Sequence, residues 1–132
     1  MKNEMSILVT SDHTDGQGHL NHVQALDFLM QSRIGFYEEC GLSDGSGQGR
    51  FGTIVVNINV NFRKECFLGE RLTVRSSPDT LGNKSFVLTQ EILRPDGEVV
   101  IEGAATSVVM DMTTREIIHV PDCLARHFTT LT

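Results

Sequence analysis

Cysteine, proline and long apolar runs are scarce in this sequence. The three cysteines lie far apart and form no CxxC pair. This argues against a disulfide framework and a cysteine zinc site, and it is typical of a reducing cytoplasm. The apolar run near the N-terminus, MSILVT, is too short for a membrane span or a secretory signal. We therefore expect a cytoplasmic protein with no membrane partner.

The sequence also lacks an excess of positive charge. Its 11 Lys and Arg residues face 17 Asp and Glu residues, for a net charge of −6. We expect no nucleic acid partner, because phosphate contacts need clustered cations. The balance is reversed in residues 50–75, where five cations stand against two carboxylates. That patch favours a small anionic ligand, although a solvated strand and loop face has the same composition.

One long helical pattern dominates the N-terminal half. In residues 22–40, apolar side chains recur at three- and four-residue spacing, which predicts an amphipathic helix. Asn21 is a suitable N-cap, and Gly41 is a suitable C-terminal stop. The residues expected on the buried helix face are Leu26, Leu29, Met30, Ile34 and Tyr37. We expect Arg33 to pair with Asp27 or Glu38, or to bind backbone carbonyls.

Strand patterns occupy most of the remaining sequence. The predicted strands cover residues 5–10, 53–62, 70–77, 85–94 and 99–112. Segment 53–62 alternates strictly, with Ile54, Val56, Ile58, Val60 and Phe62 on one side and three asparagines on the other. Turn residues separate the later strands, among them Ser77-Pro78-Asp79, and short connections imply antiparallel neighbours. We also expect a connector at 43–49, an edge strand at 115–119 and a short helix opened by Pro121.

These elements predict a single α+β domain that spans residues 1–132. One long central helix would be wrapped by a five- to six-stranded antiparallel sheet, since a twisted sheet can enclose the apolar helix face. One helix cannot cover both faces of such a sheet. We therefore expect a homodimer or a dimer of dimers, formed through a sheet edge or face.

The densest cluster of reactive side chains precedes the helix. It reads DGQGHLNH and starts at Asp15. The cluster also suggests a metal site made of His13, Asp15, His19 and His22, but the irregular spacing in a loop argues against one. Two roles are open for Asp15, because aspartate either closes an Asx turn or serves as a catalytic carboxylate.

The motif DxxGHxNH, followed by a helix that carries Arg33 and ends at Gly41, resembles the hotdog-fold acyl-CoA thioesterases of the 4-hydroxybenzoyl-CoA thioesterase type. The later GExL, which starts at Gly69, is similar to the family's entry into a strand. The likeness covers nearly the whole chain in order and spacing.

The sequence departs from the family signature at several positions. His13 stands at the first acidic position and His22 at the second asparagine. Ala25 replaces a tyrosine, and Met30 and Gln31 replace the helix glutamate. The second acidic position, which carries the catalytic carboxylate in the family, is retained as Asp15.

The resemblance implies hydrolysis of a small or medium acyl-CoA. Asp15 would act as nucleophile or general base, and the backbone N–H of His22 at the helix start would polarise the thioester carbonyl. His19 is a candidate acid or base, or else a brace of the loop. CoA is part of the substrate, so no separate cofactor is expected. The remaining contacts are assigned to Arg63 and Lys64 for CoA, and to Asn21, Leu26 and Met30 for the acyl group.

Two other functions fit the same residues. A hotdog hydratase or dehydratase would use His19 together with Asp15. A non-catalytic hotdog protein would bind an acyl or CoA group without turnover, and the lost tyrosine and glutamate are compatible with this alternative.

Overall fold

The computed structural model describes residues 2–42, 51–128 and 130–131. The connector expected at 43–49 lies outside these residues. Three elements precede the second strand: β1 (Asn3–Leu8), a short 3-10 helix η1 (Ser11–His13) and the long helix α1 (His22–Cys40). The elements that follow are β2 (Phe51–Phe62), β3 (Arg71–Leu81), β4 (Ser85–Leu93), β5 (Val99–Asp111), β6 (Glu116–Ile118), α2 (Asp122–Ala125) and β7 (Thr130–Leu131).

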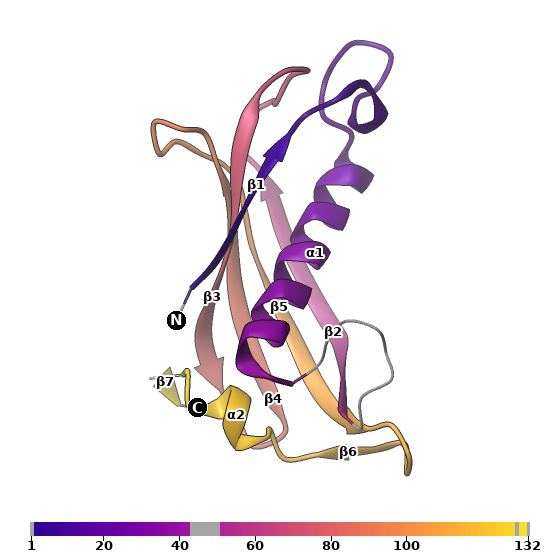
Figure 1. Ribbon diagram of the computed structural model, residues 1–132, viewed down its shortest axis with the longest axis vertical. Coiled ribbons are helices and arrows are strands. Elements are labelled where there is room, and N and C mark those ends of the chain that lie inside the picture. Colours follow the sequence, from indigo (N-terminus) through magenta and orange to yellow (C-terminus); the bar gives the residue numbers. More distant parts are fainter. Residues whose placement is uncertain (1, 43–50, 129, 132) are drawn as a thin grey trace.

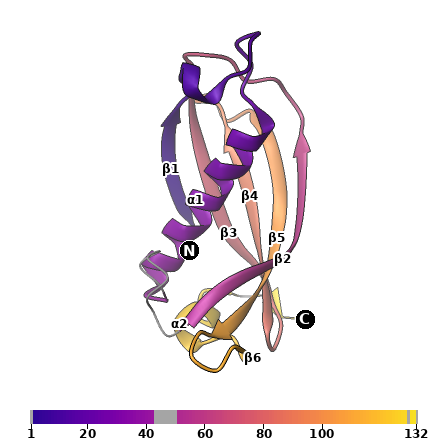
Figure 2. The same ribbon diagram turned by 90° about the vertical axis from the view of Figure 1, so that its right-hand side faces the viewer.

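The strands form one curved sheet, and α1 lies across one of its faces (Figures 1 and 2). The strand order is β1-β3-β4-β5-β2, and every neighbouring pair in this path is antiparallel. Two short strands extend the sheet, β6 beside β5 and β7 parallel to β3. The predicted α+β architecture, with a single long helix against an antiparallel sheet, is therefore confirmed.

The ends of α1 lie where the sequence predicts them. The Asn21 side chain accepts a hydrogen bond from Val23 N at 2.8 Å, which satisfies one of the free N–H groups of the first turn. Gly41 has a φ of 77° and donates its N–H to the carbonyls of Glu38 and Tyr37. Only a residue that tolerates this left-handed conformation ends the helix without strain.

The buried face of α1 differs from the predicted one. Leu29 and Tyr37 are buried as expected, but Leu26 and Met30 are exposed by 37% and 44%. The helix packs against β1 and β3, so the side of α1 that faces β2 is left uncovered by this chain. The residues that α1 buries are Ala25, Phe28, Leu29, Ser32, Arg33, Phe36, Tyr37 and Cys40.

The apolar side chains of β2 are likewise uncovered. A β-bulge at Val56 shifts the register, so that Val55 pairs with Ser107 while Asn57 pairs with Thr106. Strict alternation across 53–62 is therefore wrong, because the extra residue places Val55 rather than Ile54 on the face shared by Ile58. The exposed apolar residues of this strand are Ile54, Val55, Val56, Ile58 and Phe62.

The predicted break at Ser77-Pro78-Asp79 is also wrong, because β3 continues through it to Leu81. Pro78 pairs with Leu88, and the register between β3 and β4 shifts between Pro78 and Thr80. Proline lacks an N–H for the sheet, and a bulge accommodates the missing donor without ending the strand.

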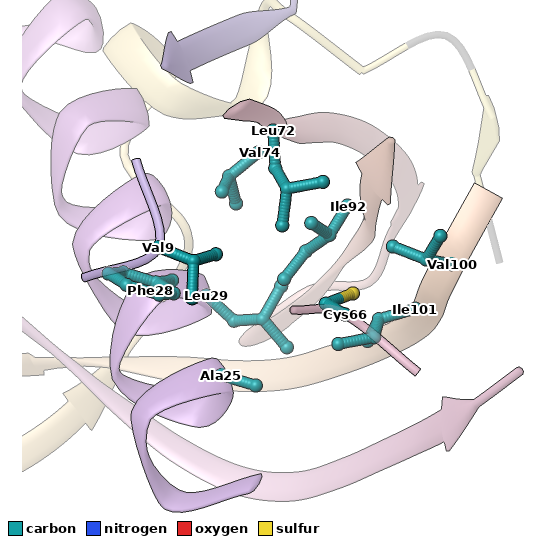
Figure 3. Close-up of a cluster of buried hydrophobic side chains, with 10 residues drawn as sticks. All are labelled: Val9, Ala25, Phe28, Leu29, Cys66, Leu72, Val74, Ile92, Val100 and Ile101. Atoms are coloured by element: carbon teal, nitrogen blue, oxygen red, sulfur yellow. The ribbon is translucent and has the colours of Figure 1, made fainter. Parts of the chain in front are cut away.

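The core is divided into two clusters along α1. Figure 3 shows the cluster beside the start of the helix, where Ala25, Phe28 and Leu29 face side chains from the sheet such as Val74 and Ile92. The second cluster surrounds Phe36 and Tyr37 and includes Leu124 of α2. No helix in the described part of the chain is long and apolar enough to cross a membrane.

Gly103 makes a testable contribution to the sheet. A Cβ at this position would lie 2.1 Å from the backbone oxygen of Asn59, the residue that pairs with Ala104. We predict that Gly103→Ala separates β2 from β5 and lowers the free energy of unfolding by about 1–3 kcal/mol, as overpacked sites do. Urea denaturation measures the change. Gly16→Ala is the matched control, because a Cβ there meets nothing within 4 Å. Equal stability of the two variants would contradict the prediction.

Candidate active site

The site is built on the loop between β1 and α1. Asp15 and His19 approach across a tight turn, in which Asp15 N donates to His19 O at 2.9 Å and Gly18 N donates to Asp15 O at 3.1 Å. The φ of Gly18 is 81°, a conformation that glycine adopts without strain. Leu20 N then donates to Cys66 O at 2.8 Å. The loop is therefore held by its own turn and by the segment after β2.

The Asp15 carboxylate is exposed and partly engaged by this turn. Its Oδ1 atom accepts from Gln17 N at 2.9 Å and from His19 N at 3.1 Å. These backbone N–H groups, with a smaller contribution from the His19 side chain, lower the pKa of Asp15 below its ordinary value. The Asx turn is therefore present. It occupies one carboxylate oxygen, and Oδ2 has no hydrogen bond to any described residue.

The first turn of α1 presents a backbone donor to the same space. Val23 N is occupied by the Asn21 cap. His22 N has no acceptor among the described residues, and it lies at the positive end of the helix dipole. The sequence predicted a free donor at His22, and this N–H is open, whereas the next N–H along the helix, that of Val23, is occupied.

A pocket of about 370 Å³ brings most of the predicted site residues together. It lies between the start of α1 and the end of β2. The walls also include residues that the sequence gave no signal for, since Phe62, Cys66 and Ile101 belong to other parts of the chain. The complete lining is Asp15, His19, Leu20, Asn21, His22, Ala25, Phe62, Arg63, Lys64, Glu65, Cys66 and Ile101.

His19 lines the pocket and also braces it. Its Nδ1 atom is 3.7 Å from Glu65 Oε1, and its ring meets Phe67 edge-on with centroids 5.1 Å apart. Its backbone N–H binds Asp15. The bracing role is thus visible in the contacts, while the pocket position leaves the imidazole within the space where a substrate would lie.

The two predicted CoA anchors, Arg63 and Lys64, both line the pocket, but they differ in whether their charge is already paired. Arg63 is exposed, and its Nη2 atom donates to Glu102 Oε1 at 2.8 Å. Lys64 is exposed too, and its ammonium has no ion-pair partner within the described residues. An unpaired ammonium is more available to a phosphate than a guanidinium already bound to a carboxylate.

The predicted acyl contacts are not all in this pocket. Asn21 lines the pocket, but its side-chain oxygen is used by the helix cap. Leu26 lies exposed on the helix side that faces β2. Met30 lines a second cavity, of about 230 Å³, farther along α1. The other residues of that cavity are Arg33, Ile34, Tyr37, Thr53 and Val55.

Arg33 corrects a further prediction. It pairs with neither Asp27 nor Glu38, and its Nη1 atom instead donates to Gln90 Oε1 at 2.8 Å. The reason is that the Arg33 side chain is buried, whereas Asp27 is half-buried and bonded to Gln31, and Glu38 is exposed. Helix spacing alone did not reveal this environment, because Gln90 comes from β4.

The histidines do not gather around a metal position. No group of three or more potential metal ligands occurs in residues 2–42, 51–128 and 130–131. His13 accepts a hydrogen bond from Thr10 N at 3.1 Å through Nδ1 and meets Phe28 edge-on. It therefore fastens the loop to the helix.

The lowered pKa of Asp15 is directly testable. Because the N–H groups of Gln17 and His19 favour the charged form, we predict a carboxyl titration midpoint below the ordinary 3.8. A depressed pKa stabilises the fold above the unfolded-state pKa, and this contribution disappears as the pH falls through the folded-state pKa. Carbon-detected NMR of the Asp15 carboxyl measures the midpoint. A value at or above 3.8 would contradict the role given to the turn.

Comparisons with known proteins agree with this geometry. Residues 9–128 match the model of the thioesterase-like superfamily. The chain is 32% identical over 114 residues to the long-chain acyl-CoA thioesterase FadM of Escherichia coli, covering 86% of each protein. It is 26% identical over 130 residues to a 1,4-dihydroxy-2-naphthoyl-CoA hydrolase of Synechococcus, covering 93% of this chain and 87% of that one.

A solved structure shows the same arrangement. The probable thioesterase YbaW of Escherichia coli superimposes with a TM-score of 0.78 at 29% identity, over 95% of each chain. The predicted hotdog fold and the predicted thioester hydrolase are thereby confirmed. The chain belongs to the thioesterase-like superfamily.

Proposed function

We propose that this protein hydrolyses acyl-CoA thioesters in the pocket between α1 and β2, with Asp15 as nucleophile or general base. The observation that carries the proposal is the placement of Asp15 and His22 on one pocket, with a carboxylate oxygen and a backbone N–H both left unbound. The names of two relatives, a long-chain acyl-CoA thioesterase and a 1,4-dihydroxy-2-naphthoyl-CoA hydrolase, support the substrate class.

The chemistry needs a donor for the developing oxyanion and a group that delivers oxygen to the carbonyl carbon. The N–H of His22 is the donor, and one such donor stabilises the transition state by about 3 kcal/mol. Asp15 Oδ2 either removes a proton from the attacking water or attacks directly, after which water opens the acyl-enzyme anhydride. In both routes the C–S bond breaks and CoA leaves as its thiolate. The lowered pKa of Asp15 keeps the carboxylate ionised for either role.

The substrate would be held at both ends of its thioester. CoA phosphates bind at the rim, chiefly to Lys64, because Arg63 is already paired with Glu102. The acyl chain follows the uncovered side of α1, past Leu26 and Met30. These exposed apolar side chains favour medium and long chains over short ones, in agreement with the name of one relative, a long-chain acyl-CoA thioesterase.

We also propose a homodimer in which a second copy covers β2. Within the described residues this strand lies at the edge of the sheet and pairs on one side only, with β5. A twelve-residue edge with exposed apolar side chains is a template for pairing with another strand. The free, unpaired thiols of Cys40, Cys66 and Cys123 support a cytoplasmic location for the assembly.

The role of Asp15 is tested by Asp15→Asn. Asparagine keeps an oxygen that accepts from Gln17 and His19, so the turn should survive while the carboxylate chemistry is lost. We expect kcat/KM to fall by about a thousandfold, within the range for a positioned acid–base group. Thiol release from a panel of acyl-CoA thioesters, read with a thiol-reactive dye, gives the rate. Asp12→Asn, an exposed change in the same loop, should leave it unaltered.

The same panel separates this proposal from its alternatives. Wild-type protein that binds CoA esters but releases no thiol would be a non-catalytic binder. Conversion of an enoyl-CoA without thiol release would identify a hydratase. Full turnover by Asp15→Asn would exclude the carboxylate as nucleophile or base.

The homodimer is tested by a charge on β2. Ile58 is 44% exposed in the single chain, so a dimer that covers this face would bury it. We expect Ile58→Lys to raise the dimer dissociation constant by at least about tenfold, because a buried unpaired charge costs several kcal/mol. Light scattering across a concentration series measures the constant. Asn59→Lys is the control, one step along the strand on the opposite face. An undisturbed Ile58→Lys dimer would contradict this interface.

A further inference from the structure

The second cavity lies on the same side of α1 as the active-site pocket. Its lining side chains come from Met30, Arg33, Ile34 and Tyr37 of α1 and from two residues of β2. Figure 2 shows β2 alongside the helix from its start towards its end. Positions 22, 26, 30, 33 and 37 recur at helical spacing, so one face of α1 leads from the thioester site to this cavity.

Arg33 brings an uncompensated charge to the cavity wall. Its side chain is only 6% exposed, and its single hydrogen bond to a described residue goes from Nη1 to Gln90 Oε1. Gln90 is itself fixed, because its amide donates to Leu29 O and to Ser76 Oγ, each at 2.8 Å. No carboxylate lies within ion-pair distance of Arg33 in the described chain. A guanidinium offers five N–H donors, and most of those of Arg33 have no acceptor among the described residues.

Tyr37 adds a second unused donor. It is 6% exposed, and its hydroxyl makes no hydrogen bond of normal geometry to a described residue, although the hydroxyls of Ser107 and Thr53 lie close enough to interact with it. Burial raises the pKa of Tyr37, against smaller opposite effects of those two hydroxyls and of the Arg33 charge, so the hydroxyl keeps its proton. A buried hydroxyl without a well-formed hydrogen bond is costly, and Tyr37 is one of the residues that line the second cavity.

We propose that this cavity binds the terminal carboxylate of an acyl chain whose thioester lies at Asp15 and His22. The inference rests on the proposed function and names its substrate class, the CoA monothioesters of dicarboxylic acids. A carboxylate would accept from the Arg33 guanidinium and the Tyr37 hydroxyl together, which compensates the buried charge. The methylene groups between the two ends would lie against Leu26 and Met30.

The distance along α1 between the active-site pocket and the second cavity agrees with this occupant, and so does the composition of β2. Arg33 lies eleven positions after His22, which corresponds to roughly 16 Å along the helix axis. A second copy paired along β2 would not neutralise Arg33 from that strand, because β2 contains no Asp or Glu. Sites built to hydrogen-bond a polar group reject the analogue that lacks it, since the donors are then left buried and unpaired.

The experiment compares chains of equal length with and without the terminal carboxylate. For wild-type protein we expect kcat/KM for sebacoyl-CoA and dodecanedioyl-CoA to exceed that for decanoyl-CoA and dodecanoyl-CoA by at least about tenfold. A ratio of one or below would overturn the inference. Thiol release from the unsubstituted chains would at the same time uphold the thioesterase proposal, so the two conclusions fail separately.

Two variants locate the effect. Tyr37→Phe removes an oxygen that makes no hydrogen bond of normal geometry to a described residue, so it tests the cavity with little change to the native packing. We expect it to lower the ratio about fivefold, and Arg33→Met to lower it below one, as expected for lost hydrogen bonds to a charged group. Arg75→Met is the control, since Arg75 lies between Glu4 and Glu91 away from the cavity and should leave the ratio unchanged. A Tyr37→Phe ratio equal to that of wild type would overturn the inference.

If no thioester is hydrolysed, a binding measurement tests the carboxylate subsite instead. Calorimetric titration with free sebacate and free decanoate reports on the cavity without turnover. Preferential binding of sebacate that Tyr37→Phe weakens would support the carboxylate subsite even though the thioesterase proposal had failed. Equal binding of the two acids, or no binding of sebacate, would overturn it.

Discussion

The structure depends on how little of the sheet a single helix can cover. α1 packs against β1 and β3, and this buries one side of the helix in two apolar clusters. The side that faces β2 is left open, and so are the apolar side chains of β2 itself. The active-site pocket, the second cavity and the proposed dimer surface all lie along this uncovered side.

The electrostatics of the site come from the backbone more than from side chains. Asp15 is exposed, so burial does little to its carboxylate, while two backbone N–H groups of its own turn lower its pKa. The helix start adds a positive dipole end at His22. The Asn21 cap occupies the N–H of Val23, and in doing so it fixes the backbone that carries the neighbouring free N–H. The residue that caps the helix thereby also positions the proposed oxyanion donor.

The active-site pocket and the second cavity lie towards the two ends of the uncovered side of α1, and they carry different polar groups. At the loop end, a carboxylate faces a free backbone donor, and the rim carries Arg63 and Lys64. At the far end, Arg33 and Tyr37 offer donors and the described chain provides no carboxylate for them. Between these ends the helix presents apolar side chains. A ligand with a polar group at each end and methylene groups between them is complementary to this sequence of environments.

The sequence by itself determined the elements whose signals are local. Asn21 and Gly41 defined the limits of α1 because caps act within a few residues, and the DxxGHxNH spacing predicted a site at Asp15 and the helix start, which line one pocket. Tertiary structure decided everything that depends on distant partners. It left Leu26 and Met30 exposed, it carried β3 through Pro78, and it placed Arg33 beside Gln90 rather than Asp27. Helical spacing shows which residues share a face of α1. Which face is buried depends on the sheet that packs against the helix. The sheet partners of Ser32 and Arg33 are Ser76 of β3 and Gln90 of β4, which lie 44 and 57 residues away in the sequence.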